Sequence, residues 1–180
     1  MKIKSIMILA LATILSLSVM IGCTQKGSEN ITPGGQLPKV HEAVKKTFGE
    51  TYIPSTPYDA PQLEEMFGVK KDLVKEFIAE GPMMSVQVDT FIGIEAQEGK
   101  ADQVETALKA YKQRLIDTSL QYPMNLPKIK ESAVQRIDNY VFFMILGEIP
   151  MNAETDEAQL AAAKAETKKA TDAVESILKK

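Results

Sequence analysis

Hydrophobic residues recur along this chain with two periods, one typical of helices and the other typical of strands. Spacings of three and four residues place apolar side chains on one face of a helix, and they predict helices over residues 37–48, 100–120 and 153–178. Alternating or continuous apolar residues predict strands over residues 74–79, 85–96, 133–137 and 140–146. The predicted order is therefore helix, strand, strand, helix, strand, strand, helix.

Residues typical of helix caps and of turns support the predicted ends of these helices and strands. Asp59 can cap a short helix that ends at Gly68, and Asn152 can cap the long helix that begins at residue 153. The dipeptide Asp138-Asn139 tolerates left-handed backbone angles, so we expect a tight hairpin between the last two strands. Residues 122–127 contain two prolines and predict an extended crossing that leads into this hairpin.

The two faces of each strand indicate how the sheet is covered. Over residues 85–96 one face is apolar, whereas the other carries Asp89, Phe91 and Glu95, which predicts one buried face and one wetter face. Residues 140–146 are apolar or aromatic throughout, as in a central strand covered on both sides. Paired strands alternating with helices predict an α+β fold, with a four-stranded antiparallel sheet and helices mainly on one face.

The N-terminus has the layout of a secretory signal. Basic residues precede an apolar run at residues 6–21, which is shorter than the roughly 20 residues needed to span a membrane. The run ends in Met20-Ile21-Gly22-Cys23, which resembles the lipobox of bacterial lipoproteins, with methionine in place of the usual leucine. The resemblance implies cleavage between Gly22 and Cys23 and a diacylglyceryl group on the Cys23 thiol. The alternative is a free cysteine behind an uncleaved anchor helix.

The chain therefore divides into three parts. We expect residues 1–22 to be a cleaved signal, residues 23–36 a flexible lipidated tether, and residues 37–180 a single α+β domain. The tether is polar and rich in Gly, Ser and Pro, so it cannot bury enough surface to offset its ordering entropy. Two acyl chains hold a protein stably in a bilayer, where one chain is marginal. The expected location is the extracytoplasmic face of the cell membrane.

Charge and cysteine content narrow the range of partners. The sequence has 21 Lys and Arg against 24 Asp and Glu, a net charge of −3, and loss of Lys2 and Lys4 with the signal makes it more acidic. An acidic surface argues against nucleic acid, which requires basic patches, and against electrostatic adhesion to an anionic membrane. The membrane contact is therefore expected to run through the lipid on Cys23, the single cysteine, which leaves no disulfide.

Three segments carry a resemblance to a known family. They are the strand Ile92–Ala96 with its following helix, which contains Gln113-Arg114-Leu115; the pair Tyr122-Pro123; and the hairpin Val134–Val141. Over residues 37–148 the pattern resembles the bacterial lipoprotein family that carries domain of unknown function 4358. The resemblance implies a lipid-tethered envelope domain of the Gram-positive type. It implies no activity, substrate or catalytic residue.

The sequence contains no group of residues with the spacing of a catalytic or metal-binding site. His41 is the single histidine, and Lys45 stands where a zinc-protease helix needs its second ligand, so we expect an exposed, ordinary histidine and no metal. Asp89 and Glu95 share a strand face but lie about 20 Å apart, too far for an acid pair. Met83 and Met84 point to opposite faces of a strand, which favours packing over copper binding. We therefore expect no cofactor and no enzymatic activity.

Four residues are candidates for an interaction surface: Phe91, Asp89, Arg114 and Tyr122. Phe91 among acids can mark a recognition surface, or the C-terminal helix can cover it, and we favour covering. Arg114, near Tyr122, can anchor an anionic ligand or form an ordinary ion pair on the helix surface. The leading hypothesis is a non-enzymatic envelope module that binds a protein or cell-wall partner. The alternatives are a small-ligand receptor of a transport or signalling system, and an enzyme that acts through carboxylates.

Overall fold

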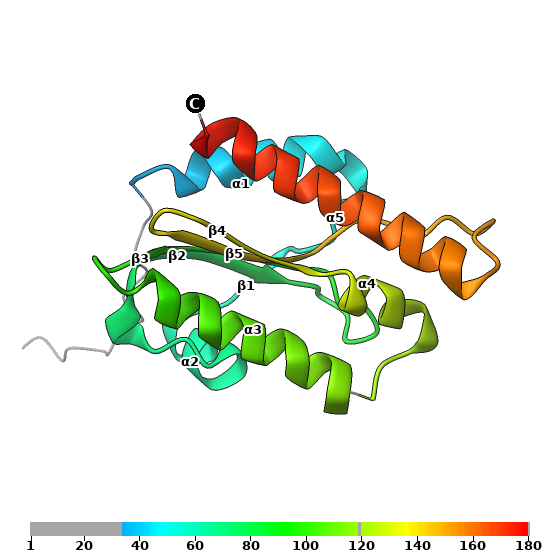
Figure 1. The fold of residues 1–180 in the computed structure, drawn as a ribbon, viewed down its shortest axis with the longest axis horizontal. Helices are drawn as coiled ribbons and strands as arrows, with labels where there is room; N and C mark the ends of the chain where they lie inside the picture. Colours follow the sequence, from blue (N-terminus) through cyan, green and yellow to red (C-terminus); the bar gives the residue numbers. More distant parts are fainter. Residues whose placement is uncertain (1–33, 119, 180) are drawn as a thin grey trace, which may run out of the picture.

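The computed structural model describes residues 34–118 and 120–179, in which an open antiparallel sheet lies between two layers of helices (Figure 1). The strands are β1 (Thr56–Pro57), β2 (Val74–Gly81), β3 (Thr90–Ala96), β4 (Ala133–Ile137) and β5 (Tyr140–Ile145). The α-helices are α1 (Leu37–Phe48), α2 (Ala60–Phe67), α3 (Ala101–Thr118), α4 (Leu126–Lys130) and α5 (Asp156–Leu178). Single turns of 3-10 helix are η1 (Gly49–Thr51), η2 (Lys71–Leu73) and η3 (Pro123–Asn125). The strand order is β1-β2-β3-β5-β4.

Helices α2 and α3 cover one face of the sheet. The apolar stripe of α3 that the sequence predicts meets the inward residues of β3 and β5, because a helix stripe and a strand face must bury each other. This core includes Leu63, Phe67, Ile92, Ile94, Val104, Leu108, Val141 and Phe143. The prediction that β5 is a central strand is confirmed, since β5 lies between β3 and β4 with both faces buried.

Helices α1 and α5 cover the opposite face. The residues that they bury form a second core, which includes Leu37, Val40, Val44, Phe91, Phe142, Met144, Ala170 and Val174. The expectation of helices mainly on one face is therefore wrong. The physical reason is that α1 and α5 each carry an apolar stripe of their own, and the alternate residues of β3 and β5 supply the surface that buries it.

The sheet has five strands rather than the expected four. Thr56 and Pro57 pair with Gly81 and Glu80 and so add β1 at the edge next to β2. A two-residue strand has no alternation to read, and its proline suits an edge position, where one backbone N–H is not needed. For these reasons the sequence pattern gave no sign of it.

Strand β3 begins at Thr90, five residues later than predicted. The preceding segment turns away from the sheet, where the backbone N–H of Gln87 donates to the carbonyl of Met84 at 3.1 Å. The side chain of Asn125 donates to the carbonyl of Val86 at 2.8 Å and so satisfies a group that a strand partner would otherwise take. The apolar alternation of residues 85–89 therefore serves loop packing. The predicted wet face of β3 is buried as well.

Local signals predicted several bounds well. Asp59 caps α2 in a reciprocal capping box with Gln62, and Gly68 ends that helix with a φ of 74°. Asp138 has a φ of 52° in the two-residue turn between β4 and β5, which confirms the hairpin. Helix α5 begins at Asp156 with Thr155 as its cap, so the expected cap at Asn152 is wrong.

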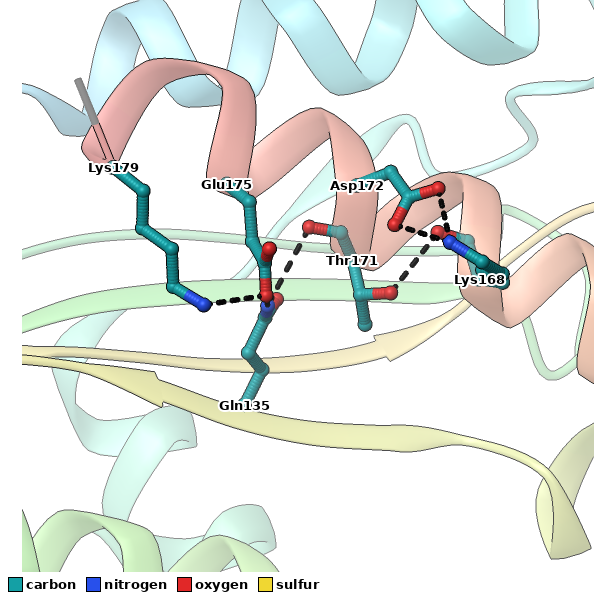
Figure 2. A network of polar contacts seen from close by, with 6 residues as sticks. All are labelled: Gln135, Lys168, Thr171, Asp172, Glu175 and Lys179. Carbon is teal, nitrogen blue, oxygen red and sulfur yellow. Dashed lines mark hydrogen bonds and ion pairs between the residues drawn. The ribbon is translucent and has the colours of Figure 1, made fainter.

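Helix α5 is tied to the edge strand β4 by a polar contact. The side-chain amide of Gln135 donates to Glu175 at 3.2 Å and to the carbonyl of Thr171 at 3.4 Å (Figure 2). Ion pairs within the helix, among them that of Lys168 with Asp172 at 2.6 Å, lie at the surface. Over residues 34–118 and 120–179, no helix has the length and apolar character to cross a membrane.

Candidate functional site

Three loop segments meet at one end of the sheet and enclose a cleft of about 480 Å³. The first segment precedes β3, the second forms η3 and α4, and the third follows β5. Their residues that line the cleft include Val86, Gln87, Asp89, Met124, Asn125, Lys128, Glu148, Ile149 and Met151, and Ile53 adds to one wall. The contact of Asn125 with Val86 described above joins two of these segments.

A buried ion pair lies in this cleft. The Lys128 ammonium donates to both carboxylate oxygens of Asp89 at 2.7 Å, and only 13% of the Lys128 side chain and 4% of the Asp89 side chain are exposed. Burial raises the pKa of Asp89 above its ordinary value, although the charge and hydrogen bond of Lys128 lower it. The pair links α4 to the start of β3, and it therefore fixes the shape of the cleft.

Two exposed methionines line the cleft, and further exposed apolar side chains occur in loops that are close to it in sequence. Met124 and Met151 line it and are largely exposed, and Met83, Met84, Leu120 and Tyr122 in the neighbouring loops are exposed too. Methionine is flexible and polarisable, and it recurs on surfaces that adapt to a partner. Clustered exposed apolar residues mark interaction sites more often than single ones. The loop end of the sheet therefore has the character of a contact surface.

The opposite end of the sheet receives the start of the described chain. The backbone N–H of Gly34 donates to Glu76 of β2 at 2.8 Å, and Glu76 faces Glu95 near the end of β3. Glu95 and Asp89 are six residues apart, so about 20 Å separate this end from the cleft. In Figure 1 the described chain begins, and α5 ends, at the side opposite to α4 and the segment before α5.

The carboxylates of Glu76 and Glu95 come together across β2 and β3. A Cβ added at Gly35 would stand 2.7 Å from one oxygen of Glu76 and 3.1 Å from one of Glu95, so Gly35 covers both groups. Burial raises the pKa of Glu95, but hydrogen bonds from Lys75 at 2.5 Å and Tyr140 at 3.2 Å more than offset this and lower it. This acid pair is part of the dock for residues 34–35 and does not face an open cleft.

His41 is buried, which contradicts the expectation of an exposed residue. Its Nε2 lies 3.1 Å from both the Tyr52 hydroxyl and a carboxylate oxygen of Glu80. Burial raises the pKa of Glu80, but His41 and then Tyr52 outweigh it, and the net shift is downward. A signal existed in the sequence, because position 41 falls on the buried stripe of α1 beside positions 37, 40, 44 and 48.

The four candidate surface residues do not form one site. Phe91 is fully buried, with its ring 5.0 Å from that of His41. It is therefore covered rather than exposed, but the contact comes from α1 and not from the C-terminal helix that was expected to cover it. Asp89 lies in the cleft with Lys128. Arg114 donates to the Met66 carbonyl at 2.9 Å and lies over the Tyr111 ring, and Tyr122 is 55% exposed before η3. Lys128 and Asn125 have no signal in the sequence, because only contacts with residues 39 positions away place them at the cleft.

Within the described parts of the chain, no group of three or more His, Cys, Asp or Glu side chains is placed to hold a metal ion. The predicted cleavage site at Gly22, the lipidation site at Cys23 and the tether as far as residue 33 lie outside the described residues.

Residues 48–146 match the protein family described as Domain of unknown function (DUF4358). The match covers more than half of the chain. The chain belongs to the DUF4358 family. The matched region contains every strand of the described sheet and helices α2, α3 and α4. It also contains two of the three loop segments that form the cleft. No curated protein and no solved structure matches the chain.

Helices α1 and α5 lie almost wholly outside the DUF4358 match, yet one face of its sheet depends on them. Phe91, Phe142 and Met144 belong to the matched region and are buried by this helical layer. Without this helical layer, the three side chains would form part of a large exposed apolar patch, which soluble domains avoid. The folding unit of this chain is therefore larger than the matched residues.

Proposed function

We propose that this DUF4358 protein is a lipid-anchored, non-enzymatic binding module on the outer face of the bacterial cell membrane. Its partner is an envelope protein or a cell-wall component, which it holds at the cleft end of the sheet. The lipobox-like Met20–Cys23 and the polar tether support the anchor. The cleft and its apolar rim support the binding role.

The observation that carries this proposal is the opposition of the two ends of the sheet. Residues 34 and 35 attach at Glu76, whereas the cleft with Asp89 and Lys128 lies at the other end of β3. A tether that joins the domain at the Glu76 end leaves the cleft at the end of the sheet farthest from the point of attachment. A partner in the envelope therefore has access to the cleft without contact with lipid.

The cleft is suited to binding a partner because the three loop segments that form it are already held in place. The Asp89–Lys128 pair and the Asn125–Val86 contact hold the three loop segments together, and so less ordering remains when a partner binds. The methionines of the rim supply apolar area that adapts in shape. A volume of about 480 Å³ also falls in the range of small-molecule sites. A small-ligand receptor is therefore the second candidate function.

Site-specific photo-crosslinking in intact cells tests the binding role. A photoreactive amino acid in place of Met151 or Met124, both at the cleft, is expected to capture a discrete partner. The matched control replaces Glu98, which is exposed in the turn after β3 at the opposite end. Equal capture from position 98, or none from positions 124 and 151, contradicts the proposal.

Metabolic labelling with a fatty-acid analogue tests the anchor separately. The wild-type protein is expected to take up the label, and Cys23→Ser is expected to lose it. Mass analysis of the native protein supplies the second readout, since an unmodified Cys23 or a retained signal excludes the lipid anchor. Either result leaves the crosslinking experiment interpretable, because the cleft is in the folded domain.

A further inference from the structure

A second pocket of about 310 Å³ lies between the 82–88 loop and helix α3. It is distinct from the cleft, although Gln87 contributes to both. Its lining comes from the segment before α2, from the segment before β3 and the start of β3, from α3 and the segment that follows it, and from the end of β5. The residues that line it are Tyr58, Pro82, Met83, Ser85, Gln87, Val88, Thr90, Tyr111, Leu115, Gln121 and Ile145.

Not one of these lining residues is charged, in a chain in which 25% of residues are charged. The lining combines apolar side chains with side chains that carry hydroxyl and amide groups. Arg114 lies beside the lining residue Tyr111. Its guanidinium lies over the Tyr111 ring and donates to the Met66 carbonyl. A charged ligand would lose its hydration here without a counter-charge among the lining residues, which is costly.

Tyr58 and Tyr111 line the pocket, and neither hydroxyl makes a hydrogen bond with the described residues. Their rings are held firmly: Tyr111 packs edge-on against Phe67 at 4.7 Å and Phe143 at 5.2 Å, and Tyr58 packs against Phe67 at 5.2 Å. Part-buried tyrosines normally find a partner for the hydroxyl. Two fixed rings with free hydroxyls therefore form a preorganised pair of hydrogen-bonding groups.

Both tyrosines stay neutral over the physiological range. Burial raises the pKa of Tyr111 to about 12 and also raises that of Tyr58. A neutral phenol both donates and accepts a hydrogen bond. The pocket therefore offers groups that match hydroxyls or amides of a ligand, and apolar surface that matches carbon-bound hydrogens.

We propose that this pocket binds an uncharged, hydroxyl-rich ligand of the size of one sugar unit. A pyranose ring has hydroxyls at its edge and C–H groups on its faces, which is the mixture that the lining residues complement. The sugar unit can be free or part of a longer glycan, because the pocket is open to solvent. This inference does not rest on the lipid anchor or on the partner at the cleft.

Saturation-transfer NMR on the purified full-length protein tests the ligand class, with glucose, glucuronate and glucosamine as matched probes. The three differ mainly in charge, since glucuronate is anionic and glucosamine is cationic. Glucose is expected to receive saturation from the tyrosine ring protons, and the charged sugars are expected to bind at least severalfold more weakly. Absence of transfer to glucose at millimolar concentration, or equal binding of a charged sugar, overturns the proposal.

Hydroxyl-deleting variants then test the position. Tyr58→Phe and Tyr111→Phe each keep the ring packing and are expected to weaken glucose binding about fivefold, as for one lost hydrogen bond. Tyr122→Phe is the control, because Tyr122 is exposed and does not line the pocket. Binding that is equal in all three variants and in the wild-type protein places the ligand elsewhere and overturns the proposal.

A fourth variant perturbs the pocket while both hydroxyls remain. A Cβ at Gly81 would stand 1.9 Å from the Tyr58 hydroxyl oxygen, so Gly81→Ala must push the end of Tyr58 aside. We expect glucose binding to fall. Unchanged binding in a folded Gly81→Ala protein contradicts a role for Tyr58. Crosslinking at the cleft is unaffected by these results, so the two proposals fail separately.

Discussion

Lys128 holds both carboxylate oxygens of Asp89 at 2.7 Å, thirty-nine positions apart in the sequence, and both side chains are buried. Burial of a charge is tolerated only when its partner is in place. The pair therefore fixes the position of α4 relative to the start of β3. It also gives the first of four predictions about stability.

Lys128→Met is expected to destabilise the protein by about 3–5 kcal/mol, because it leaves Asp89 charged and buried without a partner. The deficit should shrink as the pH falls, since protonation of Asp89 removes the isolated charge and the pKa of Asp89 is already raised by burial. Urea unfolding at several pH values measures this. Lys168→Met is the control, because its pair with Asp172 is exposed, and a similar loss there would refute the argument.

Replacement of Phe91 should act on stability rather than on binding. Phe91→Ala removes a fully buried ring between His41 and Phe142, and we expect a loss of about 3–5 kcal/mol in the free energy of unfolding. Tyr122→Ala, at an exposed aromatic residue, is expected to change it by no more than about 0.5 kcal/mol. Thermal or urea unfolding distinguishes the two. A stable Phe91→Ala protein would mean that the ring is not in the core.

Gly35 should be far less tolerant of a side chain than its neighbour. A Cβ at Gly35 would stand 2.7 Å from a carboxylate oxygen of Glu76, whereas a Cβ at Gly34 would meet nothing within 4 Å. Gly35→Ala is expected to cost about 1–3 kcal/mol or to release residues 34–35 from Glu76, and Gly34→Ala is expected to cost little. Amide hydrogen exchange at residues 34–36 is the measurement. Equal exchange in both variants would refute this contact.

The cluster of His41, Tyr52 and Glu80 should make stability depend on acid. Burial raises the pKa of Glu80, but His41 and Tyr52 bring the net value below the usual 4.5. The folded protein therefore binds this proton less readily than the unfolded chain does. The stabilisation is present above about pH 4.5 and is lost as the pH falls through the folded-state pKa.

The double variant His41→Leu, Tyr52→Phe removes the two groups whose hydrogen bonds lower the pKa of Glu80, and the charge of Lys45 remains. We expect the midpoint of acid unfolding, followed by circular dichroism, to move to higher pH. Tyr122→Phe serves as the control because Tyr122 makes no contact with this cluster. An acid midpoint that is unchanged in the double variant would show that Glu80 does not contribute to acid sensitivity.

The sequence predicted the elements whose signals are local. The Asp59 cap, the stop at Gly68 and the Asp138 turn each depend on neighbouring residues, and all three are confirmed. The predictions for His41 and for residues 85–89 were wrong because their partners are distant. His41 is buried by Tyr52 and Glu80, and residues 85–89 are held by Asn125 and Lys128.

The sequence by itself determined the kinds of secondary structure, the apolar faces and the residues that resemble a lipobox, because periodicity, capping and turn conformation are properties of short segments. The tertiary structure alone decided that helices cover both faces of the sheet, that Phe91 lies inside, and that Asp89 meets Lys128. Those outcomes depend on which buried surfaces and charges from distant segments satisfy one another, and chain order does not encode that directly.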